Sequence, residues 1–176
     1  MIGTDRLLIR PWREADRAPY AAICRDPRVM EFLGPIPSRE ECDAAIDRMA
    51  ALQDGVGYCF WAVERRTDGA FLGFCGLKPG KWPIKGEVEI GWRLGSDHWG
   101  QGYALEAAAG CLDWGWRRLG ALEIVAITVP ANRRSWGLME RLGMMRDRQG
   151  DFDHPDLPEG SPLRPHVTYR IARPSH

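Results

Sequence analysis

The chain has 176 residues, 44% of them hydrophobic, and its 24 Lys and Arg residues balance its 24 Asp and Glu residues. This length suits one core, so we expect a single domain over residues 1–176. Zero net charge argues against nucleic-acid binding, which favours a strongly basic surface. Asp5 and Arg6 interrupt any signal-peptide hydrophobic region, and no apolar stretch approaches the roughly 18 residues of a membrane span.

Five cysteines are spread along the chain, at Cys24, Cys42, Cys59, Cys75 and Cys111. No two of them form a CxxC pair, which argues against a zinc site or a disulfide framework. We expect them to be small core residues in a reducing compartment. The sequence therefore predicts a cytoplasmic protein that binds no metal.

The first half of the chain predicts a strand, two helices and a hairpin. The expected segments are a strand at 7–11, helices at 13–24 and 38–53, and strands at 58–65 and 71–77. Ser38 and Glu41 have the spacing of a capping box, in which each side chain satisfies an amide of the first helical turn. Asp68-Gly69 is a strong hairpin signal.

The second half predicts one crossover followed by a helix and two strands. The expected segments are a strand at 87–94, helices at 103–119 and 132–142, and strands at 123–129, 144–148 and 166–171. The crossover implies one parallel pair. We expect an α+β (mixed α/β) fold with a mostly antiparallel sheet of about six to seven strands and helices on both faces. A long polar loop at 150–165 is of a kind that is often functional.

A glycine-rich turn, Trp99-Gly100-Gln101-Gly102-Tyr103-Ala104, joins a predicted strand to a predicted helix. Glycines let the backbone approach a ligand closely, and the free amides and dipole of a helix start favour an anion. This pattern indicates a diphosphate site, although a plain glycine turn is the alternative. Leu105 replaces the third glycine of a dinucleotide fingerprint, and the Gly-Lys-Ser/Thr of a Walker motif is missing.

A second motif, Asn132-Arg133-Arg134-Ser135, follows Pro130. Asn132 is a good N-cap for the helix that begins there, and Ser135 falls at the third helical position. An N-capping Asn at the end of a strand can also contact a ligand.

In their order along the chain, these motifs resemble the GNAT superfamily of N-acetyltransferases, particularly its branch of ribosomal-protein N-terminal acetyltransferases. The resemblance extends over about residues 4 to 148. It rests on residues 4–12, 88–94, 99–107, 132–135 and 140–144.

The resemblance implies transfer of an acetyl group from acetyl-CoA to a primary amine, in a sheet whose central strand splays from its parallel neighbour. Pantetheine would lie in that gap and pair with main-chain groups of Trp92, Arg93 and Leu94, as an added strand would. Asn132 would contact the pantetheine arm. The pyrophosphate would be held by main-chain amides of Gly100, Gln101, Gly102, Tyr103, Ala104 and Leu105.

Acetyl transfer needs a neutral amine, donors for the oxyanion and a thiolate leaving group. Glu89 is our hypothesis for the base, directly or through water, because it lies on the strand face opposite Val88 and Ile90. Glu87 shares that face and is the second candidate for the base. The alternatives are a solvated glutamate or an ion-pair partner. Ser135 is the candidate for stabilising or protonating the thiolate, with a purely helix-starting role as the alternative. Many relatives place a Tyr general acid where this chain has Met139.

Candidates for the acceptor side are Glu87, Trp82, Asp153 and His154, and we expect the loop at 150–165 to border the acceptor site. For His154 the alternative is a structural loop role. The sequence leaves open whether the acceptor is a protein N-terminus, such as that of a ribosomal protein, or a small-molecule amine. A non-catalytic acyl-CoA sensor and another phosphate-ligand enzyme are further alternatives. The resemblance is compatible with a homodimer.

Overall fold

The computed structural model describes residues 1–175. Its strands are β1 (Ile2–Gly3), β2 (Leu7–Arg10), β3 (Phe60–Arg65), β4 (Phe71–Pro79), β5 (Val88–Leu94), β6 (Glu123–Thr128), β7 (Met145–Asp153) and β8 (Pro165–Ala172). Its helices are α1 (Arg17–Cys24), α2 (Pro27–Met30), α3 (Arg39–Val56), α4 (Tyr103–Arg118) and α5 (Arg133–Arg141), with 3-10 turns η1 (Glu14–Asp16) and η2 (Ser96–His98).

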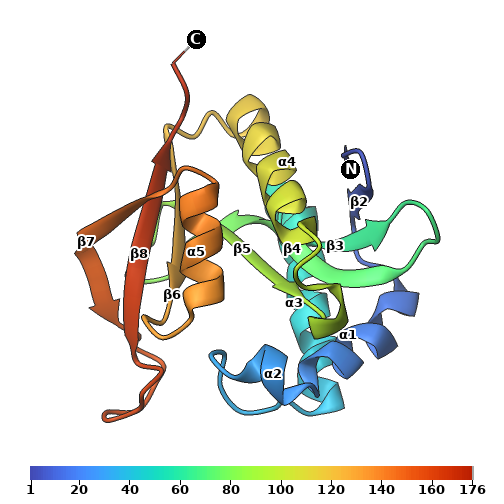
Figure 1. The fold of residues 1–176 in the computed structure, drawn as a ribbon, viewed down its shortest axis with the longest axis horizontal. Helices are drawn as coiled ribbons and strands as arrows, with labels where there is room; N and C mark the ends of the chain where they lie inside the picture. Colours follow the sequence, from blue (N-terminus) through green and yellow to red (C-terminus); the bar gives the residue numbers. More distant parts are fainter. Residues whose placement is uncertain (176) are drawn as a thin grey trace.

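The strands form one sheet in the order β1-β2-β3-β4-β5-β6-β8-β7. Among the described residues, only β5 and β6 pair in parallel, and every other pair is antiparallel. Helices α4 and α5 pack on one face, and α1 and α3 on the other (Figure 1). The predicted fold class is confirmed, but the sheet has eight strands in the described chain because the two-residue β1 adds an edge that its sequence does not signal.

Local signals explain where the helices begin and end. The predicted capping box before α3 is confirmed: the Glu41 amide donates to Ser38 Oγ at 3.1 Å, and the Ser38 amide donates to Glu41 Oε2 at 2.6 Å. The helix ends at Gly57, whose φ of 85° suits glycine. The short helix α2 was not expected from the sequence. It begins after Asp26, whose carboxylate accepts from the Arg28 amide at 2.9 Å.

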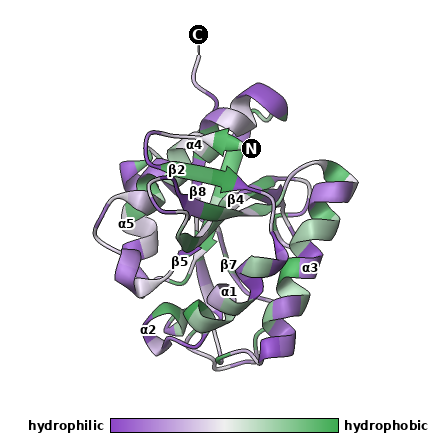
Figure 2. Ribbon diagram, turned by 90° about the vertical axis from the view of Figure 1, so that its right-hand side faces the viewer, coloured by the Kyte–Doolittle hydropathy of each residue, from purple (hydrophilic) through white to green (hydrophobic). Residues whose placement is uncertain are grey.

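Two clusters of buried side chains fill the space between the sheet and the helices. The larger lies under α4 and includes Ile90, Leu94 and Cys111, while the smaller lies under α1 and α3 and includes Tyr20 and Cys24. Hydrophobic colouring gathers accordingly in the strands between the helices (Figure 2). All five cysteines are buried and free, as expected for core residues.

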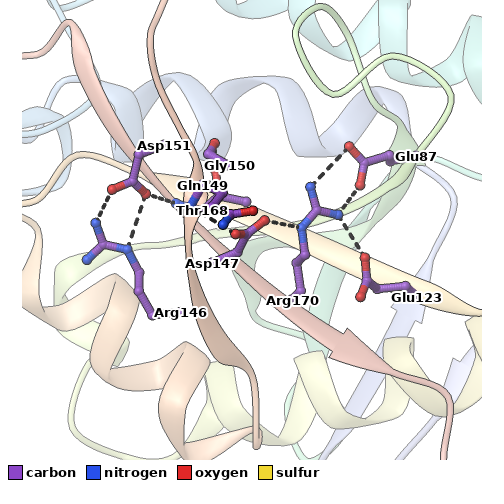
Figure 3. A network of polar contacts seen from close by, with 9 residues as sticks. All are labelled: Glu87, Glu123, Arg146, Asp147, Gln149, Gly150, Asp151, Thr168 and Arg170. Carbon is purple, nitrogen blue, oxygen red and sulfur yellow. Dashed lines mark hydrogen bonds and ion pairs between the residues drawn. The ribbon is translucent and has the colours of Figure 1, made fainter.

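The sheet opens like a wedge between β5 and β6. The two strands pair only at Val88 with Ile124 and at Glu89 with Val125, so the rest of β5 has no strand partner on that side within residues 1–175. The closed end of the wedge is held by one arginine (Figure 3): Arg170 on β8 binds Glu87, Glu123 at 2.8 Å and Asp147 at 2.7 Å.

The connection that the sequence predicts as a loop at 150–165 is shorter in the structure. Strand β7 continues to Asp153 and resumes pairing with β8 after an irregularity between Asp147 and Phe152. Within that irregularity the Gly150 carbonyl accepts from Thr168 Oγ1 at 2.6 Å. The connection is therefore confined to residues 154–164.

Candidate active site

A cleft of about 660 Å³ begins where β5 and β6 part, a size typical of small-molecule sites. One wall is β5 with the turn that follows it, and the facing wall is the start of α5. Residues of α2 and the segment after it, including Val29, Phe32 and Leu33, border the remaining side. The strand, the glycine turn and the Asn132 motif thus meet around one cavity.

The glycine turn has the backbone geometry that its sequence predicts. Gly100 and Gly102 have φ values of +73° and +80°, a region that L side chains rarely adopt. A Cβ at Gly100 would meet no atom within 4 Å, so the turn presents bare backbone there. Ala104 and Leu105, whose amides belong to the first turn of α4, also line the cleft. The free amides of a helix start form an anion site at this position.

Arg6 stabilises the conformation of the glycine turn. Its guanidinium donates to the Gln101 carbonyl at 2.9 Å and to Glu106 at 2.6 Å, and it lies 4.6 Å from the Tyr103 ring centroid. The Gln101 side chain turns back to the Asp97 carbonyl at 3.0 Å. Gln101 consequently does not line the cleft, unlike Gly100, Gly102, Tyr103, Ala104 and Leu105.

The main chain of β5 alternates in the direction of its hydrogen-bonding groups. The Gly95 amide donates to the Leu72 carbonyl at 2.9 Å, in the register that pairs Gly73 with Leu94. Because hydrogen-bonded partners alternate in antiparallel pairs, the main-chain groups of Arg93 face β4. Those of Trp92 and Leu94 face the gap. The Leu94 carbonyl already accepts from the Trp99 indole at 2.9 Å.

On the facing wall, Asn132 caps α5 as the sequence predicts. Its Oδ1 accepts from the Ser135 amide at 3.2 Å, and both residues line the cleft. The Ser135 hydroxyl has no hydrogen-bond partner among residues 1–175, so it is available to a ligand. Met139, which takes the place of the family's tyrosine, is buried and also lines the cleft.

Glu89 lines the cleft and is the only acidic residue of the described chain to do so. It forms an ion pair with Lys78 of β4, and the two side chains are only 12% and 16% exposed. Lys78 also lies 5.3 Å from the Phe60 ring centroid. Glu89 is therefore a partnered, mostly buried carboxylate rather than a solvated one, and its role as base stays a prediction.

Phe60, Phe74 and Gly91 lie between Glu89 and Arg93 and together form what we call the aromatic floor. The two rings stack at 5.3 Å with an angle of 8° between their planes. A Cβ at Gly91 would come within 2.6 Å of Phe60 Cζ, so the glycine makes room for the ring. All three residues line the cleft.

Four residues predicted for the acceptor side do not line the cleft. Glu87 binds Arg170 at the closed end of the wedge, and Trp82 is 72% exposed on the connection between β4 and β5. Asp153 lies 3.4 Å from Arg164. The His154 ring centroid is 5.0 Å from that of His166 on the β7–β8 hairpin. Glu87, Asp153 and His154 interact instead with residues of β8 and of the connection that precedes it.

Sequence reasoning missed the side chains that form the floor. Phe60 and Phe74 come from β3 and β4, and only the strand register brings them beside Gly91 and Arg93. No local spacing signals this arrangement. The segment after α2, with Phe32 and Leu33, was missed because the short helix itself was not expected.

Within residues 1–175, no group of three or more His, Cys, Asp or Glu side chains is arranged to hold a metal ion. In the same part of the chain, no helix combines the length and apolarity needed to cross a bilayer.

Comparison with known proteins identifies the family. Residues 6–145 match the acetyltransferase (GNAT) domain. The uncharacterized protein YkkB of Bacillus subtilis is 31% identical over 142 residues, covering 80% of this chain and 83% of that protein. An acetyltransferase structure from Agrobacterium tumefaciens is 28% identical, with a TM-score of 0.80 over 98% of this chain and 94% of that one. The protein belongs to the GNAT acetyltransferase family.

Two more distant structures share the fold. A ribosomal-protein-S5-alanine acetyltransferase from Vibrio fischeri has a TM-score of 0.75 at 16% identity, covering 97% of this chain and 94% of that one. A spermidine N-acetyltransferase from Vibrio cholerae has a TM-score of 0.74 at 18% identity, covering 96% of both chains. At these identities the likeness extends to the fold alone.

Proposed function

We propose that this GNAT protein is an acetyl-CoA-dependent N-acetyltransferase that moves an acetyl group directly onto the nitrogen of a primary amine. The observation that carries the proposal is the continuity of one cleft, which joins the glycine turn at residues 100–105 to Glu89. An anion-binding turn and a carboxylate able to accept a proton share this cavity. The unpaired edge of β5 runs between them.

The residues present fit acetyl-CoA. Amides of residues 100–105 would hold the pyrophosphate, main-chain groups of Trp92 and Leu94 would pair with the pantetheine amides, and Asn132 would border the pantetheine arm. When bound, acetyl-CoA supplies the acetyl group as a thioester. Arg133 and Arg134 on the same cleft add positive charge that favours a phosphorylated ligand.

Glu89 acts as the base in this proposal. An ammonium has no lone pair, so the acceptor must lose a proton to Glu89, directly or through water, before its nitrogen attacks. Lys78 stabilises the negative charge of Glu89 through their ion pair. An α-amine, with a pKa of about 7.7–8.0, needs less help than a lysine-like amine at about 10.4. A carboxylate base therefore favours an α-amine.

Ser135 completes the reaction on the other wall. Its hydroxyl would donate a hydrogen bond to the sulfur as the carbon–sulfur bond breaks. No cysteine lines the cleft in the described part of the chain, since all five thiols are buried in the core. This supports direct transfer to the amine over transfer through an acetylated cysteine.

For the acceptor we propose the α-amine of a peptide or of a protein N-terminus, ribosomal proteins included. The names of fold neighbours support both classes of acceptor that the sequence leaves open, because one acts on a ribosomal protein and another on spermidine. A small-molecule amine is the second candidate.

Thiol release from acetyl-CoA, measured with N-terminal peptides, dipeptides and spermidine, tests the proposal. We expect release that depends on an α-amine, with the acetyl group found on its nitrogen. Binding of coenzyme A without turnover on any amine would favour the acyl-CoA sensor. Tighter calorimetric binding of ATP or NAD than of coenzyme A would favour another phosphate-ligand enzyme.

A further inference from the structure

Arg93 is a cation at the cleft that has no acidic partner in the part of the chain that the structure describes. Its Nη1 donates to the Tyr20 hydroxyl at 3.2 Å and contacts Cys24 Sγ at 3.3 Å. Its Nε is buried and has no hydrogen-bond partner among residues 1–175. No carboxylate of the described chain lies within ion-pair distance of it, whereas Arg28 on the same cleft binds Asp26 at 2.8 Å.

The groups packed around Arg93 are neutral. Its guanidinium carbon lies 5.5 Å from the Phe74 ring centroid and 6.0 Å from that of Tyr20. Burial raises the pKa of the Tyr20 hydroxyl, which therefore stays a phenol at neutral pH. Removing a cation from water without an anion is costly, and the rings of Phe74 and Tyr20 offset only part of that cost.

The strand register sets Arg93 and Glu89 at opposite ends of the aromatic floor. Residues 89, 91 and 93 of β5 share one face, and their partners on β4 are Lys78, Gly76 and Phe74. The Phe60 ring fills the space over Gly91 between the two ends. One face of the cleft therefore presents, in order, a carboxylate, an apolar surface and a guanidinium.

We infer that Arg93 binds the carboxylate of the acceptor, and that the acceptor is a short peptide with its α-amine at Glu89 and an apolar side chain on the aromatic floor. This inference rests on the proposed function and narrows its acceptor from peptides and protein N-termini to short peptides with a free carboxylate. A guanidinium offers paired donors that match a carboxylate.

Glu89 and Arg93 lie four residues apart on β5, which places their Cα atoms about 13 Å apart at 3.3 Å per residue. This spacing suits a short peptide, whose extended chain advances by about 3.3–3.6 Å per residue. A polyamine is disfavoured because its far ammonium would meet Arg93.

Binding of acetylated products tests this inference without requiring turnover. Calorimetry on the CoA-bound protein would compare N-acetyl-Ala-Phe with its C-terminal amide, which lacks only the negative charge. We expect the acid to bind about tenfold to a hundredfold more tightly, as a hydrogen bond to a charged group provides. Arg93→Gln should abolish the difference, and Arg93→Lys should retain part of it. Arg28→Gln is the matched control and should preserve it.

Equal binding of the acid and the amide to the wild-type protein would overturn the inference, even if Arg93→Gln does not fold. An unchanged preference for the acid in a folded Arg93→Gln variant would overturn it as well. The proposed function fails differently: acid-selective binding without thiol release from acetyl-CoA would retain the Arg93 subsite and remove the transferase activity.

Discussion

The two ends of the cleft consist of different kinds of chemical group. The end proposed for acetyl-CoA is made largely of main-chain groups, supplied by the unpaired edge of β5, the glycine turn and the helix starts. The end proposed for the acceptor is made of side chains from β3, β4 and β5 that only the sheet register brings together. Substitutions should therefore act on the first end through backbone conformation and on the second through charge.

The largest effect is expected at Glu89. Glu89→Gln removes the proposed base and should lower kcat/KM by about 100-fold or more, the range for general-base catalysis, while KM for acetyl-CoA changes little. Steady-state rates between pH 6 and 9 measure this. Glu87→Gln is the matched control, because it changes the same chemistry two residues away, in the Arg170 network of Figure 3.

The control should keep its activity and lose at most about 1 kcal/mol of stability, as expected for a partly exposed ion pair. Near-normal kcat/KM in Glu89→Gln across this pH range would remove the assignment of Glu89 as base. Equal losses in both variants would point to a structural role for both carboxylates.

The second-largest effect is expected from a change of backbone conformation at the glycine turn. Gly100→Ala places a methyl group in open space at a φ of +73°, and we expect KM for acetyl-CoA to rise more than about tenfold as the turn shifts. Gly57→Ala matches it, with open space and a φ of +85° at the end of α3. Both should cost about 1–2 kcal/mol of stability, but only Gly100→Ala should affect KM. An unchanged KM would show that the turn does not hold the donor.

A substitution at Ser135 distinguishes a role in catalysis from a role in capping helix α5. Ser135→Ala should lower kcat about five- to tenfold through loss of one hydrogen bond to the departing sulfur, with little change in thermal stability. The cap depends on Asn132 Oδ1, not on the Ser135 hydroxyl, so Asn132→Ala should lower stability by about 1 kcal/mol. If Ser135→Ala leaves kcat intact, its hydroxyl has no part in the reaction.

The smallest expected effect is a change in the pH dependence of stability at His166, outside the cleft. Burial lowers the pKa of His166 on β8, so the unfolded chain binds its proton more readily. The corresponding stability is present above the unfolded pKa of about 6.5 and is lost as pH falls through the folded value. The ring is partly exposed, which limits the loss to less than about 1 kcal/mol. Urea unfolding at pH 8 and pH 5.5 should show a smaller drop for His166→Phe than for the wild type.

His98 in η2 has its pKa lowered in the same direction, again chiefly by burial. His166→Phe should therefore remove only part of the acid sensitivity. An identical pH dependence in the variant and the wild type would show that His166 titrates alike in the folded and unfolded chains.

The difference between the two ends of the cleft also explains which parts of the candidate site the sequence predicts. The glycine turn, the caps at Ser38 and Asn132 and the strand at 87–94 are local patterns, and each appears in the structure near its expected place. Backbone ligand sites depend on such patterns, so their positions are readable from spacing.

The acceptor end is not local, and several residues expected near it lie elsewhere in the structure. The polar composition of 150–165 suggested a long loop at the site, but pairing with β8 extends β7 to Asp153 and turns its side chains to the hairpin. Arg93 was expected to contribute main chain, yet the pairing with β4 leaves only its side chain for the cleft. Strand register determines both outcomes, and register depends on contacts distant in sequence.

Intact-protein mass spectrometry combined with thiol release tests the central claim most directly. The protein would be mixed with acetyl-CoA alone and then with Ala-Phe. We predict no acetylated protein in the first mixture, and in the second stoichiometric release of coenzyme A with the acetyl group on the peptide α-nitrogen. An acetyl group trapped on the protein would contradict direct transfer, and failure to acetylate any amine despite coenzyme A binding would contradict the proposed activity.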